Sequence, residues 1–390
     1  MKRIEISERP HWRTLAEEVG FVFHTIDDAP YWNESAYYQF TLQQVEDDLE
    51  APTEELHAMA MDLVPEILRS EEKLIQLDIP HPFWDYIANT WQDRSRHLYG
   101  RMDLSYDGSG PAKLLELNYD TPTSLFETGF FQWVWLEELI QTGKLPATAD
   151  QFNSLQDQLE NAFNHLKIPQ PFYLASVRDS LEDKGTVSYL MDLAAQCGHE
   201  VSYIALEDIG VDGEQFVDTD NRPIHSLFKL YPWEFLIREE FAASIPGSNT
   251  SWIEPAWKLL LSNKGILPLL WEKYPDHPNL LPAYFETAAT SALDPGWVRK
   301  PLFSREGANV EMLTTKREKL SSSGAYADGR FIRQALHALP HYRDSRLQQE
   351  NYAVIGSWVV VNRAAGIGVR EDSTPITRDS SRFVPHIILD

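Results

Sequence analysis

The chain has 390 residues and a formal net charge of −25 at pH 7, with a sequence pI of ≈ 4.8. A surface with this much negative charge repels nucleic-acid phosphates and anionic lipids. The composition therefore argues against nucleic-acid and membrane partners. The single cysteine, Cys197, can form no internal disulfide, and the start MKRIEISERPHW has no apolar signal core. Together these features predict a cytoplasmic protein.

The region from residue 12 to residue 99 is expected to be mainly helical. Apolar residues recur at spacings of three and four in WRTLAEEVGF and again from residue 39 to residue 77. Thr53, followed by Glu54 and Glu55, predicts a helix start with acidic residues in its first turn. The first strand signal begins at Arg101.

Two short strands, MDLSY and KLLELN, flank the turn sequence DGSGP. If this hairpin closes symmetrically, Asp103 lies opposite Glu116 and Arg101 lies opposite Asn118, all on one polar face. Two facing acids destabilise a sheet unless a cation separates them, and these oxygen ligands suit Mg²⁺. A solvent-exposed sheet face of mixed charge explains the spacing equally well.

Beyond the hairpin, hydroxyl groups cluster at a strand-to-helix junction. Thr121, Thr123 and Ser124 could lie where free helix amides bind an anion, or they could simply cap the helix. Residues 124–166 are then expected to be helical. PFYLASV, TVSYLMDLAAQCG and EVSYIAL follow as a β-α-β pattern. A hairpin and a strand are predicted within residues 211–233, and strands with one helix at RFIRQALHAL complete a mixed α/β architecture.

The segment RMDLSYDGSGPAKLLELNYDTPTS resembles the RMD…E-x-N-x-D segment of the glutathionylspermidine synthase family, in its synthetase portion. Similar blocks follow in the family's order at 228–236, 253–275, 299–310 and 334–340, and in VNRAAGIGVRED. The resemblance implies an ATP-grasp fold and ATP-dependent ligation of a carboxylate to an amine through an acyl phosphate. It also implies ATP and Mg²⁺ as cofactors, and small-molecule substrates: a peptide or amino-acid carboxylate plus an amine.

The same resemblance implies an organisation of the chain. We expect a single body over 1–390, in a form that lacks the family's amidase domain. Its approximate parts are a helical region with the metal-binding hairpin (1–165), a small α/β unit like a pre-ATP-grasp domain (166–245), and the ATP-grasp nucleotide-binding region (246–390).

The family pattern also implies roles for individual residues. Asp103, Glu116 and Asn118 would bind Mg²⁺. Arg101 would hold the acyl carboxylate and the transferred phosphate, and Arg370 would meet the γ-phosphate. The residues expected at ATP are Lys264, Lys300, Ser304, Arg305, Gly307, Gln334, Leu336 and Leu339, and those expected at the acyl substrate are Arg101, Thr121, Thr123 and Glu127.

Two departures from the family pattern motivate a rival hypothesis. The phosphate-covering loop SREGAN has only one glycine, Gly307. Arg382 falls where polyamine-using members carry an acid, although Asp379 is nearby, so the use of spermidine and of glutathione is in doubt. The rival is a catalytically weak ATP-grasp relative that binds nucleotide or peptide as a partner or regulator.

Overall fold

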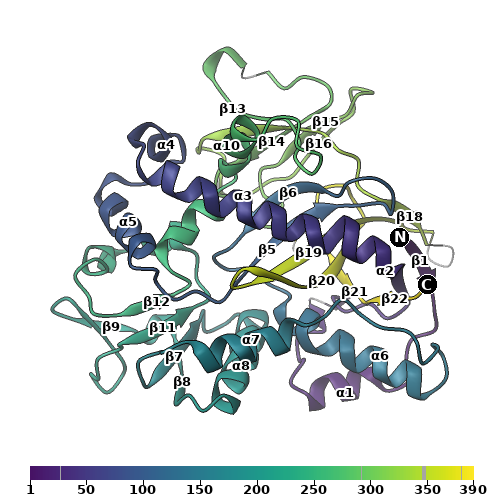
Figure 1. Ribbon diagram of the computed structural model, residues 1–390, viewed down its shortest axis with the longest axis horizontal. Helices are drawn as coiled ribbons and strands as arrows, with labels where there is room; N and C mark the ends of the chain where they lie inside the picture. Colours follow the sequence, from purple (N-terminus) through teal and green to yellow (C-terminus); the bar gives the residue numbers. More distant parts are fainter. Residues whose placement is uncertain (27, 291, 345–347, 379) are drawn as a thin grey trace.

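The computed structural model of the chain describes residues 1–26, 28–290, 292–344, 348–378 and 380–390. Helices and several sheets alternate along it, in a mixed α/β architecture (Figure 1). The α-helices are α1 (Trp12–Glu18), α2 (Leu42–Val45), α3 (Ala51–Leu68), α4 (Glu71–Gln76), α5 (Trp84–Gln92), α6 (Gln132–Gln141), α7 (Leu155–His165), α8 (Leu181–Gln196), α9 (Trp233–Leu236) and α10 (Ile266–Lys273). Shorter turns are the π-helical η1 (Glu46–Glu50) and η3 (Glu127–Phe131), and the 3₁₀ segments η2 (His81–Phe83), η4 (Leu206–Asp208), η5 (Glu240–Ser244), η6 (Ala256–Leu261) and η7 (Ala288–Thr290).

The largest sheet is antiparallel and holds the predicted hairpin. Its strands run in the order β21-β20-β19-β5-β6, and β18 also pairs with β19. The hairpin is therefore a neighbour of strands that follow it by more than 200 positions in the chain. The strand bounds are β5 (Tyr99–Ser105), β6 (Lys113–Asn118), β18 (His341–Arg343), β19 (Glu350–Val360), β20 (Arg363–Asp372) and β21 (Arg382–Val384).

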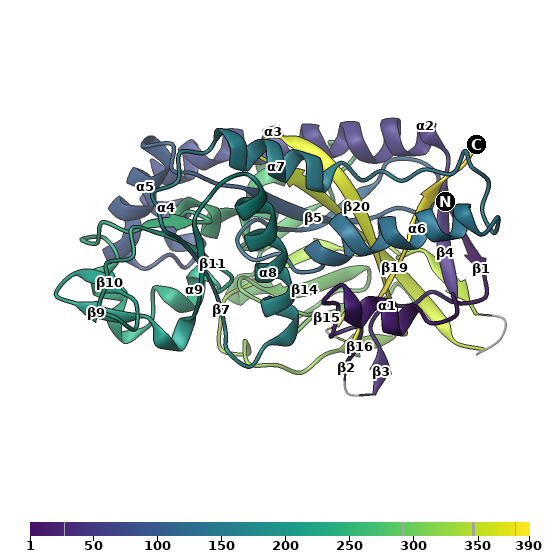
Figure 2. The same cartoon turned by 90° about the horizontal axis from the view of Figure 1, so that it is seen from below.

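A four-stranded parallel sheet contains the predicted β-α-β unit. Helix α8 joins β7 to β8, and the chain then returns through the hairpin β9–β10 to β11 on the other side of β7 (β8 in Figure 1, the other elements in Figure 2). The direction in which strands are added therefore reverses at β7, which makes the carboxyl edge beside it a common place for ligands. The bounds are β7 (Phe172–Ser176), β8 (Val201–Ala205), β9 (Gly210–Asp212), β10 (Gln215–Val217), β11 (Ser226–Lys229) and β12 (Ser251–Ile253).

A five-stranded antiparallel sheet has the strand order β13-β17-β14-β15-β16. It carries Lys300 on β14 and the loop SREGAN between β14 and β15, both of which are expected at ATP. A smaller sheet, β1-β4-β22, joins the two ends of the chain, which lie close together in Figure 1. The remaining bounds are β1 (Lys2–Glu5), β2 (Thr25–Ile26), β3 (Ala29–Pro30), β4 (Ala36–Phe40), β13 (Ala283–Phe285), β14 (Trp297–Pro301), β15 (Glu311–Leu313), β16 (Lys319–Ser321), β17 (Phe331–Ala335) and β22 (His386–Ile388).

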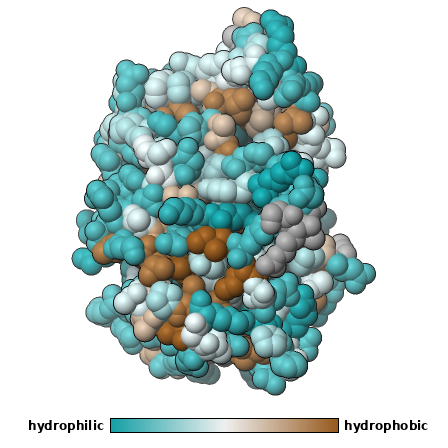
Figure 3. Space-filling model, turned by 90° about the vertical axis from the view of Figure 1, so that its right-hand side faces the viewer, coloured by the Kyte–Doolittle hydropathy of each residue, from teal (hydrophilic) through white to brown (hydrophobic). Residues whose placement is uncertain are grey.

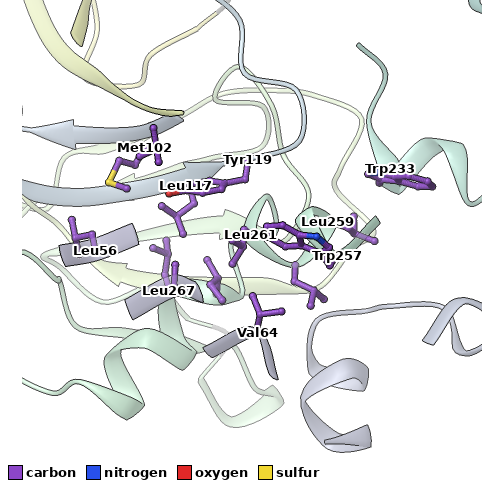
Figure 4. Packing of buried hydrophobic residues seen from close by; sticks show 14 of the residues in the cluster. Leu56, Val64, Met102, Leu117, Tyr119, Trp233, Trp257, Leu259, Leu261 and Leu267 are labelled. Atoms are coloured by element: carbon purple, nitrogen blue, oxygen red, sulfur yellow. The ribbon is translucent and has the colours of Figure 1, made fainter. Parts of the chain in front are cut away.

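The apolar face of the hairpin belongs to the larger of two main hydrophobic clusters. Met102 and Leu104 of β5 are fully buried together with Leu56 and Val64 of α3 and with leucines of η6 (Figure 4). Because side chains alternate along a strand, this packing turns Arg101 and its polar neighbours to the opposite face. The core therefore fixes which way the candidate site faces.

Two helix predictions were wrong in detail. Helical structure begins after Thr41, which forms a capping box with Gln44, and continues through α3. Thr53 is therefore inside α3, where its buried hydroxyl bonds to Ser357 instead of starting the helix. The segment RFIRQALHAL contains β17, not a helix, because Phe331–Ala335 pairs with both β13 and β14. Apolar spacing in so short a segment does not separate strand from helix.

Residues 142–154 were also expected to be helical, but the structure describes a break there between α6 and α7.

The face seen in Figure 3 is mostly hydrophilic, and its apolar side chains are gathered in a few groups. In the described part of the chain, no helix combines the length and apolar character that a membrane span requires.

Candidate active site

The register predicted for the hairpin is confirmed at its polar positions. Asp103 pairs with Glu116, and Arg101 pairs with Asn118. Beyond Asp103 the register shifts by one residue, so that Leu104 faces Leu114. The symmetric closure was therefore right where the carboxylates lie and wrong nearer the turn, because a bulge there absorbs one residue.

The polar face of the hairpin is buried on β5 and half-buried on β6, which excludes a merely solvated sheet face. Arg101 and Asp103 are 4% and 8% exposed. The Arg101 guanidinium donates to both carboxylate oxygens of Asp103, from Nε to Oδ1 at 2.7 Å and from Nη2 to Oδ2 at 3.1 Å. Its Nη1 donates to the Thr123 carbonyl oxygen at 2.7 Å. The two hydrogen bonds to Asp103 fix the plane of the guanidinium, and the bond to Thr123 directs it toward the segment after the hairpin.

Two lysines from distant segments converge on Glu116. The Lys264 Nζ lies 3.1 Å from the Glu116 Oε2, and the Lys300 Nζ donates to the Leu115 carbonyl oxygen at 2.9 Å. Burial disfavours the charged form of Glu116, but Lys264 and Lys300 outweigh it and hold its pKa at about 2. Burial lowers the pKa of Lys300 to about 8. Neither lysine is the exposed surface side chain that its sequence position alone favours.

The loop SREGAN closes over this group of charges. Its backbone is held by Lys264, whose Nζ donates to the Ser304 carbonyl oxygen at 2.5 Å. Gly307 has φ +67°, and a Cβ atom there would lie 2.6 Å from the Thr377 carbonyl oxygen. A single glycine thus meets both requirements of the loop, the left-handed backbone and the close approach to Thr377.

The same loop is tied to the other wall of the site through Arg305. Its Nε donates to the Glu234 Oε1 at 3.0 Å, and its Nη1 donates to the Thr121 Oγ1 at 2.7 Å. Glu234 lies in the first turn of α9 and is 3% exposed. Glu234 lies within the block 228–236 that resembles the family, but its partner on the loop could not be read from spacing.

Two adjoining cavities gather nearly all the predicted residues, and they share Asp103, Glu116, Gly307 and Thr377. The first is mostly apolar, and Val298, Val310, Met312 and Ile376 form its small hydrophobic cluster. The second is polar. Of the predicted residues, the first cavity is also lined by Lys300, Gln334, Leu336 and Leu339, and the second by Arg101, Asn118, Thr121, Thr123, Lys264, Ser304, Arg305 and Arg370.

Gln334 lies in the first cavity, but its side chain is already engaged. Its Oε1 accepts from the Lys300 Nζ at 2.8 Å, and its Nε2 donates to the Leu114 carbonyl oxygen at 2.9 Å. Gln334 therefore orients Lys300 between the two sheets. Arg370 lines the second cavity, where its Nε donates to the Ser381 Oγ at 2.8 Å.

Arg382 does not join these residues. Glu371 is its register partner on β20, and its guanidinium lies 3.7 Å from the Glu371 carboxylate and also bonds to Asn351. Because neighbouring strand residues face opposite ways, Arg382 shares a face with Glu371 and not with Arg370. Although Arg382 falls where polyamine-using members of the family carry an acid, its side chain lines neither of the two cavities. Asp379 lies outside the described residues.

A buried ion pair that the sequence did not reveal supports the segment after β6. The Lys229 Nζ lies 2.6 Å from the Asp120 Oδ1, and both side chains are 0% exposed. The other oxygen of Asp120 accepts from the Trp233 backbone N–H at 2.7 Å. Asp120 thereby joins β11 and α9 to the chain just before Thr121.

Gly356 of β19 is a second residue that sequence reasoning missed. It pairs with Asp103, and a Cβ atom at this position would lie 2.8 Å from the Arg101 Cδ. The missing side chain therefore leaves the space in which Arg101 lies.

We expect Gly356→Ala to lower kcat/KM about 10²-fold, because a displacement of about 1 Å at a reacting centre has that effect. Gly356 does not have the positive φ that excludes alanine. We therefore expect the Tm of thermal unfolding to change little. Steady-state kinetics with thermal unfolding as the control measures both. Unchanged kinetics would show that the position of Arg101 is not critical.

Glu127 is the one predicted site residue that lines neither cavity. It lies on η3 and is 0% exposed, and in the part of the chain that the structure describes neither of its carboxylate oxygens makes a hydrogen bond of normal length. Other fully buried acids are paired: Asp120 with Lys229, Glu254 with Lys258 and Glu371 with Arg3. Burial raises the pKa of Glu127 to about 7, although the nearby Tyr31 and Arg370 oppose the shift.

This raised pKa predicts a pH-dependent stability change for Glu127→Gln. The folded protein holds a proton that the unfolded chain releases between about pH 4.5 and pH 7, so Glu127 lowers the free energy of unfolding as pH rises through that window. The variant should be more stable than wild type by roughly 3 kcal/mol at pH 8 and equal to it at pH 4. Urea unfolding at both pH values measures this, and equal effects at the two would contradict it.

The donor chemistry of the hairpin fits a hard divalent cation. Two carboxylates and an amide oxygen, from Asp103, Glu116 and Asn118, lie on one face of adjacent strands and line the polar cavity. Mg²⁺ prefers such oxygen ligands and completes its shell with water and phosphate. Among the residues the structure describes, no three His, Cys, Asp or Glu side chains gather at a metal-binding distance, so the amide and external ligands would be needed.

Comparison with known proteins points to one family. The family described as glutathionylspermidine synthase preATP-grasp matches residues 3–389. A Haemophilus influenzae protein named putative acid–amine ligase is 38% identical over 402 residues, and the alignment covers 99% of both chains. A solved structure of a glutathione synthetase-like effector from Globodera pallida has a TM-score of 0.54 at 10% identity and covers 98% of both chains, which shows a shared fold.

Two further relatives are longer than this chain. A trypanothione synthetase of Crithidia fasciculata is 27% identical, and the match covers 84% of this chain and 53% of that protein. The bifunctional glutathionylspermidine synthetase/amidase of Escherichia coli is 28% identical, with coverage of 92% and 60%. The chain thus spans about half to three-fifths of these two relatives.

Proposed function

The chain belongs to the glutathionylspermidine synthase family, and on this premise we propose that it joins a carboxylate to an amine through an acyl phosphate made from ATP. Membership makes it an ATP-dependent acid–amine ligase with an ATP-grasp-type fold. One observation supports the route most strongly: the carboxylates of Asp103 and Glu116 and the cations of Arg101, Lys264 and Lys300 meet where an apolar cavity adjoins a polar one. An apolar cavity suits a nucleobase, and the charges suit phosphates.

The metal proposed for this site is Mg²⁺, which would supply charge neutralisation at the ATP phosphates. Asp103, Glu116 and Asn118 are the residues that would hold it. Lys264 and Lys300 lie beside Glu116 and can neutralise phosphate oxygens from the other side. The depressed pKa of Glu116 keeps it ionised at neutral pH, as a metal ligand must be.

The reaction proposed has two steps. First, an oxygen of the substrate carboxylate attacks the γ-phosphorus, and ADP leaves. Two anions must approach each other here, and the fixed guanidinium of Arg101 can orient the carboxylate while Arg370 balances the phosphoryl charge. Second, the amine nitrogen attacks the acyl carbon, phosphate leaves, and the nitrogen loses a proton.

The acyl donor is proposed to be a small peptide or an amino acid. Thr121 and Thr123 line the polar cavity beside Arg101, and their hydroxyl groups can donate to or accept from peptide groups. The rival hypothesis of a catalytically weak regulator is not favoured, because the family and the relatives named above are ligases and synthetases.

A two-stage experiment tests this proposal. Thermal unfolding is first measured with ADP and Mg²⁺, which should raise the Tm by mass action. ADP release is then measured across a panel of amines paired with amino acids and short peptides. We expect turnover with at least one pair. Nucleotide binding without turnover on any pair would favour the regulator, and no binding would contradict both hypotheses.

A further inference from the structure

A separate cavity of about 400 Å³ opens at the carboxyl edge of the parallel sheet. Val177 follows β7, Leu206 and Glu207 follow β8, and Tyr231 lies just beyond β11. The direction of strand addition reverses at β7, so this is the edge at which open α/β sheets bind ligands. None of the residues assigned above to ATP, metal or acyl substrate lines it.

The walls of this cavity are rich in aromatic rings. Phe216 packs edge-on against Phe241 at 5.8 Å and against Trp252 at 5.1 Å between ring centroids. Tyr231 and Leu236 complete the same lining. Aromatic faces attract organic cations as well as apolar groups.

Two carboxylates stand at this cavity, and among the residues that the structure describes no lysine or arginine lines it. Glu239 accepts a hydrogen bond from the Tyr231 hydroxyl at 2.7 Å, and Glu207 accepts from the Arg178 backbone N–H at 3.2 Å. The Arg178 guanidinium is 2.6 Å from Asp208 instead. Within the described residues, neither Glu207 nor Glu239 forms a direct ion pair, although the Arg178 guanidinium interacts with Glu207 electrostatically.

We propose that this cavity binds an organic ammonium ion with an apolar body. Both the aromatic walls and the unpaired carboxylates favour a cation over a neutral molecule or an anion. This inference rests on the proposed function. The expected ligand is therefore the amine substrate of the ligase, a primary amine that carries an alkyl or aryl group.

Helix α9 links the cavity to the candidate active site. Glu234 of α9 lines the polar cavity with Arg101, whereas Leu236, two residues later, lines the aromatic cavity. The two cavities therefore share one short wall. An amine held by its apolar body on one side of α9 is adjacent to the site where the acyl phosphate would form.

Direct binding tests the proposal without ATP. Benzylamine, a cation at pH 7.5, and benzyl alcohol, its neutral counterpart, are titrated against the full chain by ligand-observed NMR. We expect benzylamine to bind about tenfold more tightly, since a cation–π contact with a nearby carboxylate has that order of effect. The double variant Glu207→Gln/Glu239→Gln should remove this difference, and Phe241→Ala should weaken both ligands.

The matched control is Glu240→Gln, an exposed neighbour that does not line the cavity. It should leave both affinities unchanged. Equal binding of the two probes, or an equal loss in the control, would overturn the proposal. If the protein ligates some amine but shows no selective binding of benzylamine, the proposed ammonium site is contradicted and the proposed ligase function is retained. Selective binding with no turnover on any substrate pair would leave the cavity's ligand class intact and contradict the ligase.

Discussion

Asp103→Asn is expected to lower kcat/KM for ATP-dependent ligation by about 10²- to 10³-fold or more. The change removes the charge of one proposed metal ligand and also the bidentate partner that fixes Arg101. Losses of this size follow the removal of one electrostatic contact to a transition state. ADP release with a substrate pair found in the screen measures the effect, and excess Mg²⁺ should restore part of it if the metal is the missing component.

Asp107→Asn is the matched control on the same hairpin. Asp107 is exposed, and its side chain accepts from Ser109 within the turn, a contact that asparagine can keep. It should leave the kinetics unchanged. If Asp103→Asn were as active as Asp107→Asn, the polar face of the hairpin would not be the reacting centre.

The largest stability effect is expected for Lys229→Ala, which should lower the free energy of unfolding by about 3–5 kcal/mol. The substitution leaves the Asp120 carboxylate buried without a cation, although the Trp233 N–H still donates to it. Urea unfolding followed by tryptophan fluorescence measures the loss. Activity should fall too, because Asp120 precedes the Thr121 segment of the site.

Lys273→Ala provides the comparison for that variant. The Lys273 Nζ also lies 2.6 Å from a carboxylate, that of Asp62, but the two side chains are 23% and 62% exposed. Its removal should change stability by less than about 1 kcal/mol. The double variant Asp120→Asn/Lys229→Met should recover part of the loss. Equal losses for the two lysines would refute the role assigned to burial.

The sequence predicted those parts of the site that depend on local spacing. The pairing of Asp103 with Glu116 follows from turn chemistry and strand alternation, and the structure confirms it. The resemblance to the family extended this pair to residues from 101 to 370, all of which except Glu127 line the two cavities. Their individual roles remain predictions.

Other features depend on contacts between distant segments, and no local pattern announces them. Gly356 matters because β19 lies beside β5, and Lys229 matters because β11 ends beside Asp120. The segment 330–339 has the apolar spacing of a helix, but pairing on both sides makes β17 a strand. In each case a tertiary partner decides what the side chain or the backbone does.

Binding of Mn²⁺ by the hairpin is the most direct test of the account. Electron paramagnetic resonance can count the Mn²⁺ bound in the presence of a non-hydrolysable ATP analogue, for wild type, Glu116→Gln and Asp107→Asn. We predict tight binding in wild type and in Asp107→Asn, and at least a tenfold weaker affinity in Glu116→Gln. Equal Mn²⁺ affinity in all three proteins would contradict the claim that the facing carboxylates hold the metal with the nucleotide.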